Sequence, residues 1–318
     1  MATITTTNQQ RTALALNALD RKQRSLWADA WYRLRRNKGA MAGLVVIVAA
    51  AFVALTAQWL APYDPTQINT PIALSDPVWS GTKYVTAGHP FGTDALGRDI
   101  LSRLMYGARV SMVVGLVPTF LVFSIGISIG MLSGYKGGWV DNLLMRFTDV
   151  IYAFPDLLFL VLIVGLLRDT AVGDLLGGLV LIFGALAIVG WVGLARLVRG
   201  QVLSLKEKEF VEAARSIGAR PGRIMLRHLF PNTLAPIIVA LAFSIPGAIL
   251  GEASLGYLGI GIKPPTPTWG VMINDGFVVF STSPWPVFLP ALCISLVMLA
   301  FTFLGDGLRD ALDPRMKN

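Results

Sequence analysis

The stretch LLGGLVLIFGALAIVGWVGLA, residues 175–195, decides the fold class because it contains no charged residue over its whole length. A helix rises 1.5 Å per residue, so about 20 residues cross the roughly 30 Å hydrocarbon core of a bilayer. A soluble core does not require an uninterrupted apolar run of this length. The stretch therefore predicts a transmembrane helix.

Five further apolar runs have a similar length. The full set lies at 41–61, 110–132, 150–167, 175–195, 234–251 and 285–305, and Asp156 is its only ionisable side chain. Prolines fall inside the runs, but neighbouring helices can satisfy the freed carbonyls, so we expect kinks rather than helix ends. These prolines are Pro118, Pro155, Pro236, Pro246 and Pro290. The predicted fold class is all-α, a polytopic membrane protein with about six transmembrane helices.

The composition supports this class and argues against several kinds of site. Of the 318 residues 54% are hydrophobic and 14% are charged, whereas ordinary soluble domains have about 45–50% and 25%. Cys293 is the single cysteine, which excludes a disulfide framework and a cysteine zinc site. His89 and His228 are far apart in sequence, which argues against a histidine metal centre. We predict no metal site in this chain.

Lysine and arginine are distributed unevenly between the two sides of the predicted bundle. With the N-terminus in the cytosol, 21 of the 27 basic residues fall on the cytosolic side, which is the side where they are enriched in membrane proteins. The predicted order is a cytoplasmic tail at 1–39, a first span at 40–61, an external loop at 62–109, a core of five helices at 110–305 and a cytoplasmic tail at 306–318. The net charge of +8 then reflects orientation and contact with anionic lipid, not nucleic-acid binding.

Two amphipathic stretches flank the first span. Apolar residues recur at helical spacing within 25–38 beside several arginines, which predicts an interfacial helix; a basic anchor without a specific role is the alternative. Before the second span, four apolar residues within 100–105 form one stripe, and Asp99 and Arg103 are spaced to pair. This pattern predicts an amphipathic helix on the outer surface, with an ordinary solvated face as the alternative.

A polar segment on the cytosolic side, LSLKEKEFVEAARSIGARPGRIMLRHLFPN at 203–232, is the most informative part of the chain. Residues 207–217 favour a helix, Gly218 is a natural helix stop, and Pro221 suits the first turn of a second helix. Small side chains in this segment leave a surface that another protein could approach closely, and charged residues surround it. Such a surface suits protein docking, while an ordinary solvated loop is the alternative.

The same segment resembles the EAA loop of bacterial ABC importer permeases, whose pattern is E-A-A, three residues, G, nine residues, I-x-L-P. Matching residues keep the spacing, while His228 and Phe230 replace the Ile and Leu of the pattern. The resemblance implies the type I permease fold, with a coupling loop at 200–232 that contacts an ATPase. The coupling residues that it implies are Glu212, Ala213, Ala214, Arg215, Gly218 and Pro231.

Further stretches resemble the dipeptide, oligopeptide and nickel permeases, in particular their "C"-type subunit. They are RRNKGAMAGL at 35–44, APYDP at 61–65, FGTDALGRDILSRLMYGAR at 91–109, LGYLGIGIKPPTPTWG at 255–270 and GDGLRDALDPR at 305–315. This resemblance implies a bacterial inner-membrane location and a heterodimer with a related "B"-type permease. It also implies two cytoplasmic ATPase subunits, which bind ATP and Mg²⁺, and an external solute-binding protein.

The sequence predicts no catalytic residue and no bound cofactor. It has no GK dipeptide, and hence no G-x-x-x-x-G-K phosphate loop, no H-E-x-x-H, and no G-x-S-x-G around Ser254. An intramembrane hydrolase would need a nucleophile and a base within the bilayer. A secondary transporter would need ionisable residues near the midplane, and only Asp156 qualifies, near one end of its run.

Four residues are candidates for the translocation pathway or its gate. Asp149, Asp156 and Glu252 are the ionisable groups nearest the membrane that could meet a peptide terminus, although charges at helix ends more often face water or a partner helix. Trp269 ends the proline-rich segment IKPPTPTWG, which we expect to be a stiff surface element at the outer mouth. The expected solute is a dipeptide or oligopeptide, with nickel chelates, glutathione and sugars as alternatives.

Overall fold

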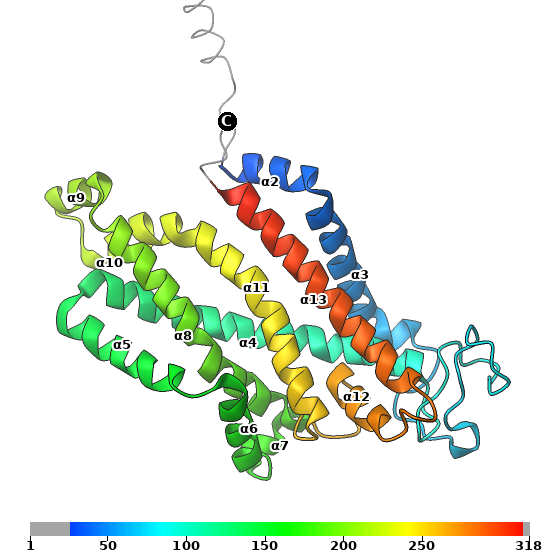
Figure 1. Ribbon diagram of the computed structural model, residues 1–318. Helices are drawn as coiled ribbons and strands as arrows, with labels where there is room; N and C mark the ends of the chain where they lie inside the picture. Colours follow the sequence, from blue (N-terminus) through cyan, green and yellow to red (C-terminus); the bar gives the residue numbers. More distant parts are fainter. Residues whose placement is uncertain (1–25, 314–318) are drawn as a thin grey trace, which may run out of the picture.

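The computed structural model describes residues 26–313, and helices make up most of this part of the chain (Figure 1). Three short turns accompany them, two of 3₁₀ type at Thr70–Ile72 and Leu175–Gly178 and one of π type at Met225–Leu229. The helices are α2 (Leu26–Arg36), α3 (Lys38–Leu60), α4 (Ile100–Lys136), α5 (Gly138–Tyr152), α6 (Asp156–Leu167), α7 (Ala171–Asp174), α8 (Leu179–Leu205), α9 (Glu209–Ser216), α10 (Pro221–Ile224), α11 (Phe230–Tyr257), α12 (Trp269–Phe277) and α13 (Trp285–Leu312).

Five helical segments are long and apolar enough to cross a membrane. They are Lys38–Leu60, Ile100–Lys136, Ala171–Leu205, Pro221–Tyr257 and Trp285–Leu312, and they confirm five of the six predicted spans. Several run past the predicted limits; the last helix continues beyond Gly305 to Leu312, into the predicted C-terminal tail. The parts of the predicted tails at 1–25 and 314–318 lie outside the described residues.

The sixth predicted span, at 150–167, is broken. It covers the last three residues of α5 and all of α6, and these two helices meet at an angle of 82°. Pro155 has extended backbone angles and precedes the first residue of α6, and a proline disfavours helical geometry in the residue before it. The expectation that Pro155 would only kink a continuous helix is therefore wrong.

The most extensive helix–helix contact among the described residues joins α4 and α8. Gly126, Gly130 and Gly134 lie one turn apart on α4, and a Cβ atom at Gly130 would stand 2.5 Å from the carbonyl oxygen of Ala195. Small residues at this spacing let two membrane helices approach closely. The adjoining ends of α5 and α8 are further joined by Arg199 of α8, which donates two hydrogen bonds of 2.6 and 2.7 Å to Asp141 of α5.

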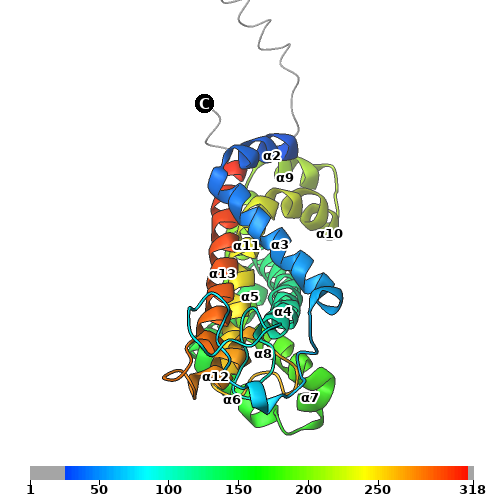
Figure 2. The same ribbon diagram turned by 90° about the vertical axis from the view of Figure 1, so that its right-hand side faces the viewer.

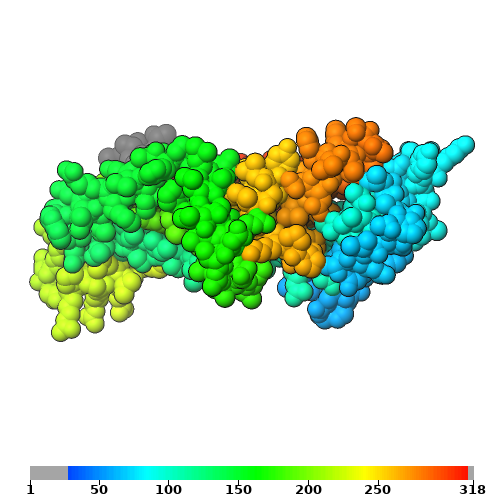
Figure 3. All heavy atoms as spheres, turned by 90° about the horizontal axis from the view of Figure 1, so that it is seen from below, coloured from blue at the N-terminus to red at the C-terminus, as the bar shows by residue number. Residues whose placement is uncertain are grey.

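The short helices and the connecting segments lie at two opposite sides of the helix bundle. In Figure 1, α2, α9, α10 and the C-terminal end of α13 lie along the upper edge, while α6, α7, α12 and the long connection 61–99 lie along the lower edge, and Figure 2 shows the same separation after a quarter turn. Seen from below, α5–α7, α12 and the connection follow one another in a row (Figure 3). The predicted topology requires this arrangement, because it places both termini and the EAA-like segment on one side.

The predicted helix at 25–38 is confirmed as α2, which is separated from α3 at Asn37. The Asn37 side chain caps α3 by accepting a hydrogen bond of 3.1 Å from the amide of Ala40. The inner face of α2 packs on the end of α13 through Ala30, Leu34 and Ala311. Trp31 on its outer face is exposed, so the helix presents an aromatic surface beside the bundle.

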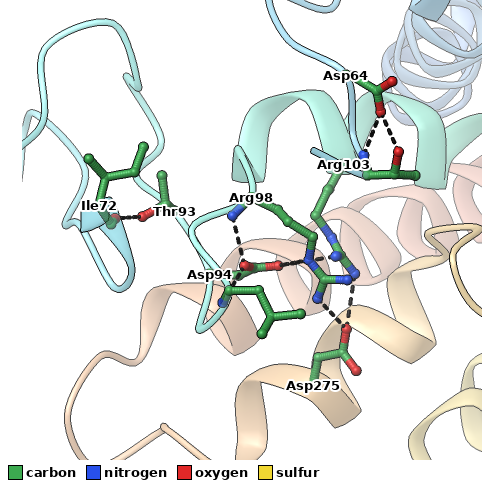
Figure 4. Close-up of polar contacts among 9 residues, drawn as sticks. Asp64, Ile72, Thr93, Asp94, Arg98, Arg103 and Asp275 are labelled. Atoms are coloured by element: carbon green, nitrogen blue, oxygen red, sulfur yellow. Dashed lines mark hydrogen bonds and ion pairs between the residues drawn. The ribbon is translucent and has the colours of Figure 1, made fainter. Parts of the chain in front are cut away.

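The connection 61–99 is held to the bundle by a buried ionic cluster (Figure 4). Arg103 of α4 contacts Asp94 at 3.1 Å and Asp275 of α12 at 3.0 Å, and Arg98 contacts the same two carboxylates at 2.7 and 2.9 Å. The predicted Asp99–Arg103 pair is wrong. Asp99 is instead the N-cap of α4 and also bonds His89 at 2.9 Å.

The amphipathic stripe at 100–105 does not form a separate outer helix. It makes the first turns of the continuous helix α4, and Ile100 and Leu104 are buried in the core between α11, α12 and α13. The stripe thus marks a face that is covered by protein, and the prediction of an independent surface helix is wrong.

Candidate functional site

The EAA-like segment bends between the short helix α9 and the helix that follows it. Helix α9 ends at Ser216, and Gly218 follows with a φ of +76°. The amide of Gly218 donates to the carbonyl of Arg215 at 2.9 Å, and the amide of Ala219 donates to that of Ala214 at 3.0 Å. These two bonds form a Schellman motif, which needs a left-handed residue at Gly218. Helix α10 then begins at Pro221 and continues through the π turn into α11, so the predicted bend is confirmed, whereas the prediction of a short second helix is wrong.

One face of α9 is anchored in the bundle. Val211 and Ala214 are buried in the same apolar cluster as Val198 and Val202 of α8. Ala214 was expected on the docking surface beside Ala213, but its side chain points inward and only Ala213 is exposed. The spacing of three residues between Val211 and Ala214 places both on one helical face, and this spacing could have revealed the inward direction from the sequence.

The opposite face of α9 and the turn after it are exposed. Glu212, Ala213, Arg215 and Gly218 lie on this side, and Pro231 is exposed in the first turn of α11. Ile217 is 85% exposed at the tip of the turn. A large apolar side chain in this position is typical of a protein contact, and the EAA pattern did not identify it.

A cavity of about 390 Å³ lies between α4, α6, α8 and α11. Its walls are mostly apolar, with three hydroxyl groups and one charged group. It is lined by Pro118, Thr119, Val122, Asp156, Leu157, Leu160, Leu186, Val189, Gly190, Ser244, Gly247, Ala248, Leu250, Gly251 and Ser254. A concave, mainly apolar site with few polar groups is typical of small-molecule binding.

The four candidate pathway residues fall in different places. Asp156 lines the cavity and is exposed. Asp149 is exposed near the end of α5 and forms an ion pair of 2.6 Å with Arg196 of α8, whose guanidinium also stacks on Tyr152. Glu252 and Trp269 line neither this cavity nor the surface. The cavity wall therefore contains only one of the four candidates.

Glu252 is fully buried in α11, at 0% exposure. Neither carboxyl oxygen has a hydrogen-bond partner of good geometry among the described residues, although the Thr268 hydroxyl is near enough to interact with the group. The expectation that this charge would face water or a partner helix is wrong. Close backbone packing of Gly256 on Gly270 of α12 encloses it.

Trp269 is 3% exposed and belongs to the core. Its indole Nε1 donates to the carbonyl of Leu104 at 3.1 Å and so attaches α12 to α4. The expected surface position for Trp269 is wrong. Lys263, at the start of the same segment, pairs with Asp174 at 2.7 Å and holds the proline-rich loop against α7.

The helix arrangement is similar to that in two crystal forms described as inward-facing conformations of the MetNI methionine ABC transporter. The first has a TM-score of 0.51 and 20% sequence identity, and the match covers 66% of this chain and 96% of that chain. The second has a TM-score of 0.50 and 19% identity, with 67% and 98% covered. The fold is that of an ABC importer permease.

Curated relatives match nearly the whole chain. The dipeptide transport system permease protein DppC of Bacillus subtilis (strain 168) is 41% identical over 98% of this chain and 92% of its own length. The oligopeptide transport system permease protein OppC of the same organism is 40% identical over 94% and 93%. A glutathione transport system permease protein, GsiD of Escherichia coli O6:K15:H31 (strain 536 / UPEC), is 40% identical over 96% and 98%.

Two family profiles match separate parts of the chain. Residues 25–77 match the N-terminal TM domain of oligopeptide transport permease C. Residues 126–318, which include the cavity helices α8 and α11 and the exposed helix pair, match the binding-protein-dependent transport system inner membrane component. With relatives at about 40% identity over almost its full length, the chain belongs to the family of inner membrane components of binding-protein-dependent transport systems.

Proposed function

We propose that this chain forms half of the path through which an ATP-driven importer carries dipeptides or oligopeptides into a bacterial cell. The supporting observation is the similarity to the dipeptide permease of Bacillus subtilis, at 41% identity over 98% of the chain. A cavity with one carboxylate and mainly apolar walls suits a solute with a charged end and variable apolar side chains. Glutathione, which is carried by another relative by name, is a peptide of the same chemical kind.

The partners proposed from the family are a related permease, two cytoplasmic ATPases that bind ATP and Mg²⁺, and an external solute-binding protein. The side with α2, α9 and α10 then faces the cytosol, since the basic residues concentrate there. The side with α12 and the connection 61–99 faces outward and offers the surface for the binding protein. This chain itself performs no chemistry in the proposal.

The exposed face of α9 is the proposed ATPase contact. Because Val211 and Ala214 are embedded beside Val198 and Val202 of α8, a displacement of α9 must move the adjoining end of α8. The same helix reaches the cavity through Leu186 and Val189. Closure of the ATPases is therefore expected to change the width of the cavity by moving α8 as a lever.

ATP-dependent uptake by the complete transporter tests the proposal. The permease pair, the ATPases and the binding protein are reconstituted in lipid vesicles, and entry of a radiolabelled dipeptide is measured with ATP inside the compartment that holds the ATPases. We expect uptake that requires every component and is lost in the Ala213→Asp variant. If a binding protein loaded with another solute stimulates ATP hydrolysis while no peptide enters, the permease role holds and the proposed solute is wrong.

A further inference from the structure

Asp156 differs from Asp141 and Asp149, the two acidic residues that precede it in the chain. Asp141 pairs with Arg199, and Asp149 pairs with Arg196. Asp156 forms no ion pair and no hydrogen bond within residues 26–313, and its side chain is exposed to the cavity. It is the only charged residue in the cavity wall.

The cavity adjoins the middle of α4. Pro118, in its wall, is midway along α4 between Ile100 and Lys136. At 1.5 Å per residue, it is about 27 Å along the helix from either end. Asp156 reaches the cavity because the chain breaks after α5, so that α6 begins at the cavity instead of passing it.

An isolated carboxylate in a mostly apolar cavity wall calls for a positive partner. Removing a charge from bulk water is costly unless an opposite charge or hydrogen-bond donors replace the water. The N-terminal end of α6, a helix of 12 residues, offsets part of this cost. A positively charged group that enters the cavity would offset the rest of this desolvation cost.

The hydroxyl groups of the wall are arranged to accept hydrogen bonds. Thr119 donates its proton to the carbonyl of Gly115 at 2.6 Å, Ser244 to that of Ala240 at 2.8 Å, and Ser254 to that of Leu250 at 2.8 Å. Their oxygen lone pairs remain available to a ligand. A primary ammonium group has three donors and no acceptor, so it matches a wall of acceptors with one negative charge.

We infer that Asp156, in a wall whose other polar side chains are hydroxyl acceptors, forms a recognition site for a primary ammonium group, which in a peptide is its free α-amino terminus. The inference rests on the proposed function for the identity of the solute. Asp156 binds the ammonium group, and the apolar walls accommodate the side chains without selecting among them. A single carboxylate with hydroxyls is a poor cage for a divalent metal ion, which takes several oxygen ligands of higher charge.

The rate at which charged reagents modify a cysteine in the cavity wall depends on the charge of this site, and it can be measured without transport. Gly247 lines the cavity, and a Cβ atom added there meets nothing within 4 Å. The Gly247→Cys variant, with Cys293→Ser, is prepared as the complete permease–ATPase complex in nanodiscs. Its rates of modification by a cationic and by an anionic methanethiosulfonate reagent are compared. We expect Asp156→Asn to lower the ratio of cationic to anionic rates about tenfold.

A control variant tests whether the effect is specific to Asp156, and protection measurements identify the group that is bound. Asp169→Asn removes an exposed acid at the far end of α6 that is not part of the cavity wall, and it should leave the ratio unchanged. Glycyl-leucine should slow the modification of the introduced cysteine when Asp156 is present, whereas N-acetyl-glycyl-leucine should not. A simple primary amine should protect in the same way as glycyl-leucine.

The outcomes separate this inference from the proposed function. An unchanged rate ratio in Asp156→Asn, or equal protection by the acetylated peptide, overturns the inference even if peptide uptake continues. Loss of the partner permease from the Asp156→Asn complex also overturns it, because Asp156 would then pair with a cation of that subunit. If the complex imports no peptide but a primary amine still protects through Asp156, the recognition site stands and the proposed solute is wrong.

Discussion

Replacing Gly218 by valine should uncouple the transporter without unfolding it. Gly218 has a φ of +76°, and a Cβ atom there would meet nothing within 4 Å, so the cost arises from backbone conformation and not from a clash. A left-handed conformation costs an L-residue about 1–2 kcal/mol. The chain can relieve this cost by giving up the two amide bonds to Arg215 and Ala214, each worth about 1 kcal/mol. Either way, the ratio of the native turn to the opened turn falls roughly 5–30-fold.

The assay is ATP hydrolysis by the reconstituted complex, with and without loaded binding protein. We expect normal membrane insertion of the Gly218→Val variant and a fall in solute-stimulated hydrolysis that does not exceed the fall in the ratio of native to opened turn. Hydrogen exchange at the amide of Ala219, which is bonded to Ala214, should accelerate in parallel. This second measurement connects the loss of coupling to the opening of the turn.

Gly222→Val is the matched control, because it adds the same side chain four residues further on. Gly222 lies within the helix α10, and a Cβ atom there also meets nothing within 4 Å. Valine is accepted in a helix slightly better than glycine, so stimulated hydrolysis should be preserved. Full coupling in Gly218→Val, or an equal loss in Gly222→Val, would refute the assignment of this turn to coupling.

Three further predictions test other parts of the structure. A cysteine in place of the exposed Ser216, in a Cys293→Ser background, should not react with an impermeant reagent added outside intact cells; labelling would reverse the proposed orientation. Trp269→Phe should lower the free energy of unfolding of the purified complex by about 1 kcal/mol, because the bond to Leu104 is lost, while uptake stays normal; an uptake defect without this destabilisation would contradict a purely structural role. Arg103→Met should cost about 2–3 kcal/mol, less than a fully buried pair, since Asp275 is partly exposed and Arg98 remains. Proteolysis of the connection 61–99 should accelerate in this variant but not in Asp64→Asn, and equal rates would show that the ionic cluster does not hold the connection.

The spans could be predicted from the sequence because lipid sets a simple requirement. A run of about 20 apolar residues has few alternatives to a membrane helix, and five such runs became helices of this kind. The break before Asp156 could not be predicted in the same way. A proline is compatible with both a kink and a helix end, and packing around it decides between them.

The direction of side chains was the main source of error. Glu252 and Trp269 were placed at surfaces because charged and amphipathic residues near helix ends usually lie there, yet both are buried where α11 and α4 meet α12. That burial accompanies the close approach of Gly256 on α11 and Gly270 on α12. No local sequence pattern connects these two glycines, because they lie on different helices. By contrast, the turn at Gly218 follows from local chemistry, and the sequence predicted it correctly.

Helix α8 connects the proposed coupling surface with the proposed recognition site. Val202, near one of its ends, packs in the same cluster as Val211 of α9, and Leu186, about 24 Å further along the helix at 1.5 Å per residue, lies in the cavity wall that also holds Asp156. Because the glycines of α4 let α8 pack against it almost backbone to backbone, α8 cannot bend freely and should move as one body. A shift driven from α9 is therefore expected to change the distance between α8 and the start of α6. ATP would then weaken or strengthen the hold on the solute's ammonium group without any contact between nucleotide and solute.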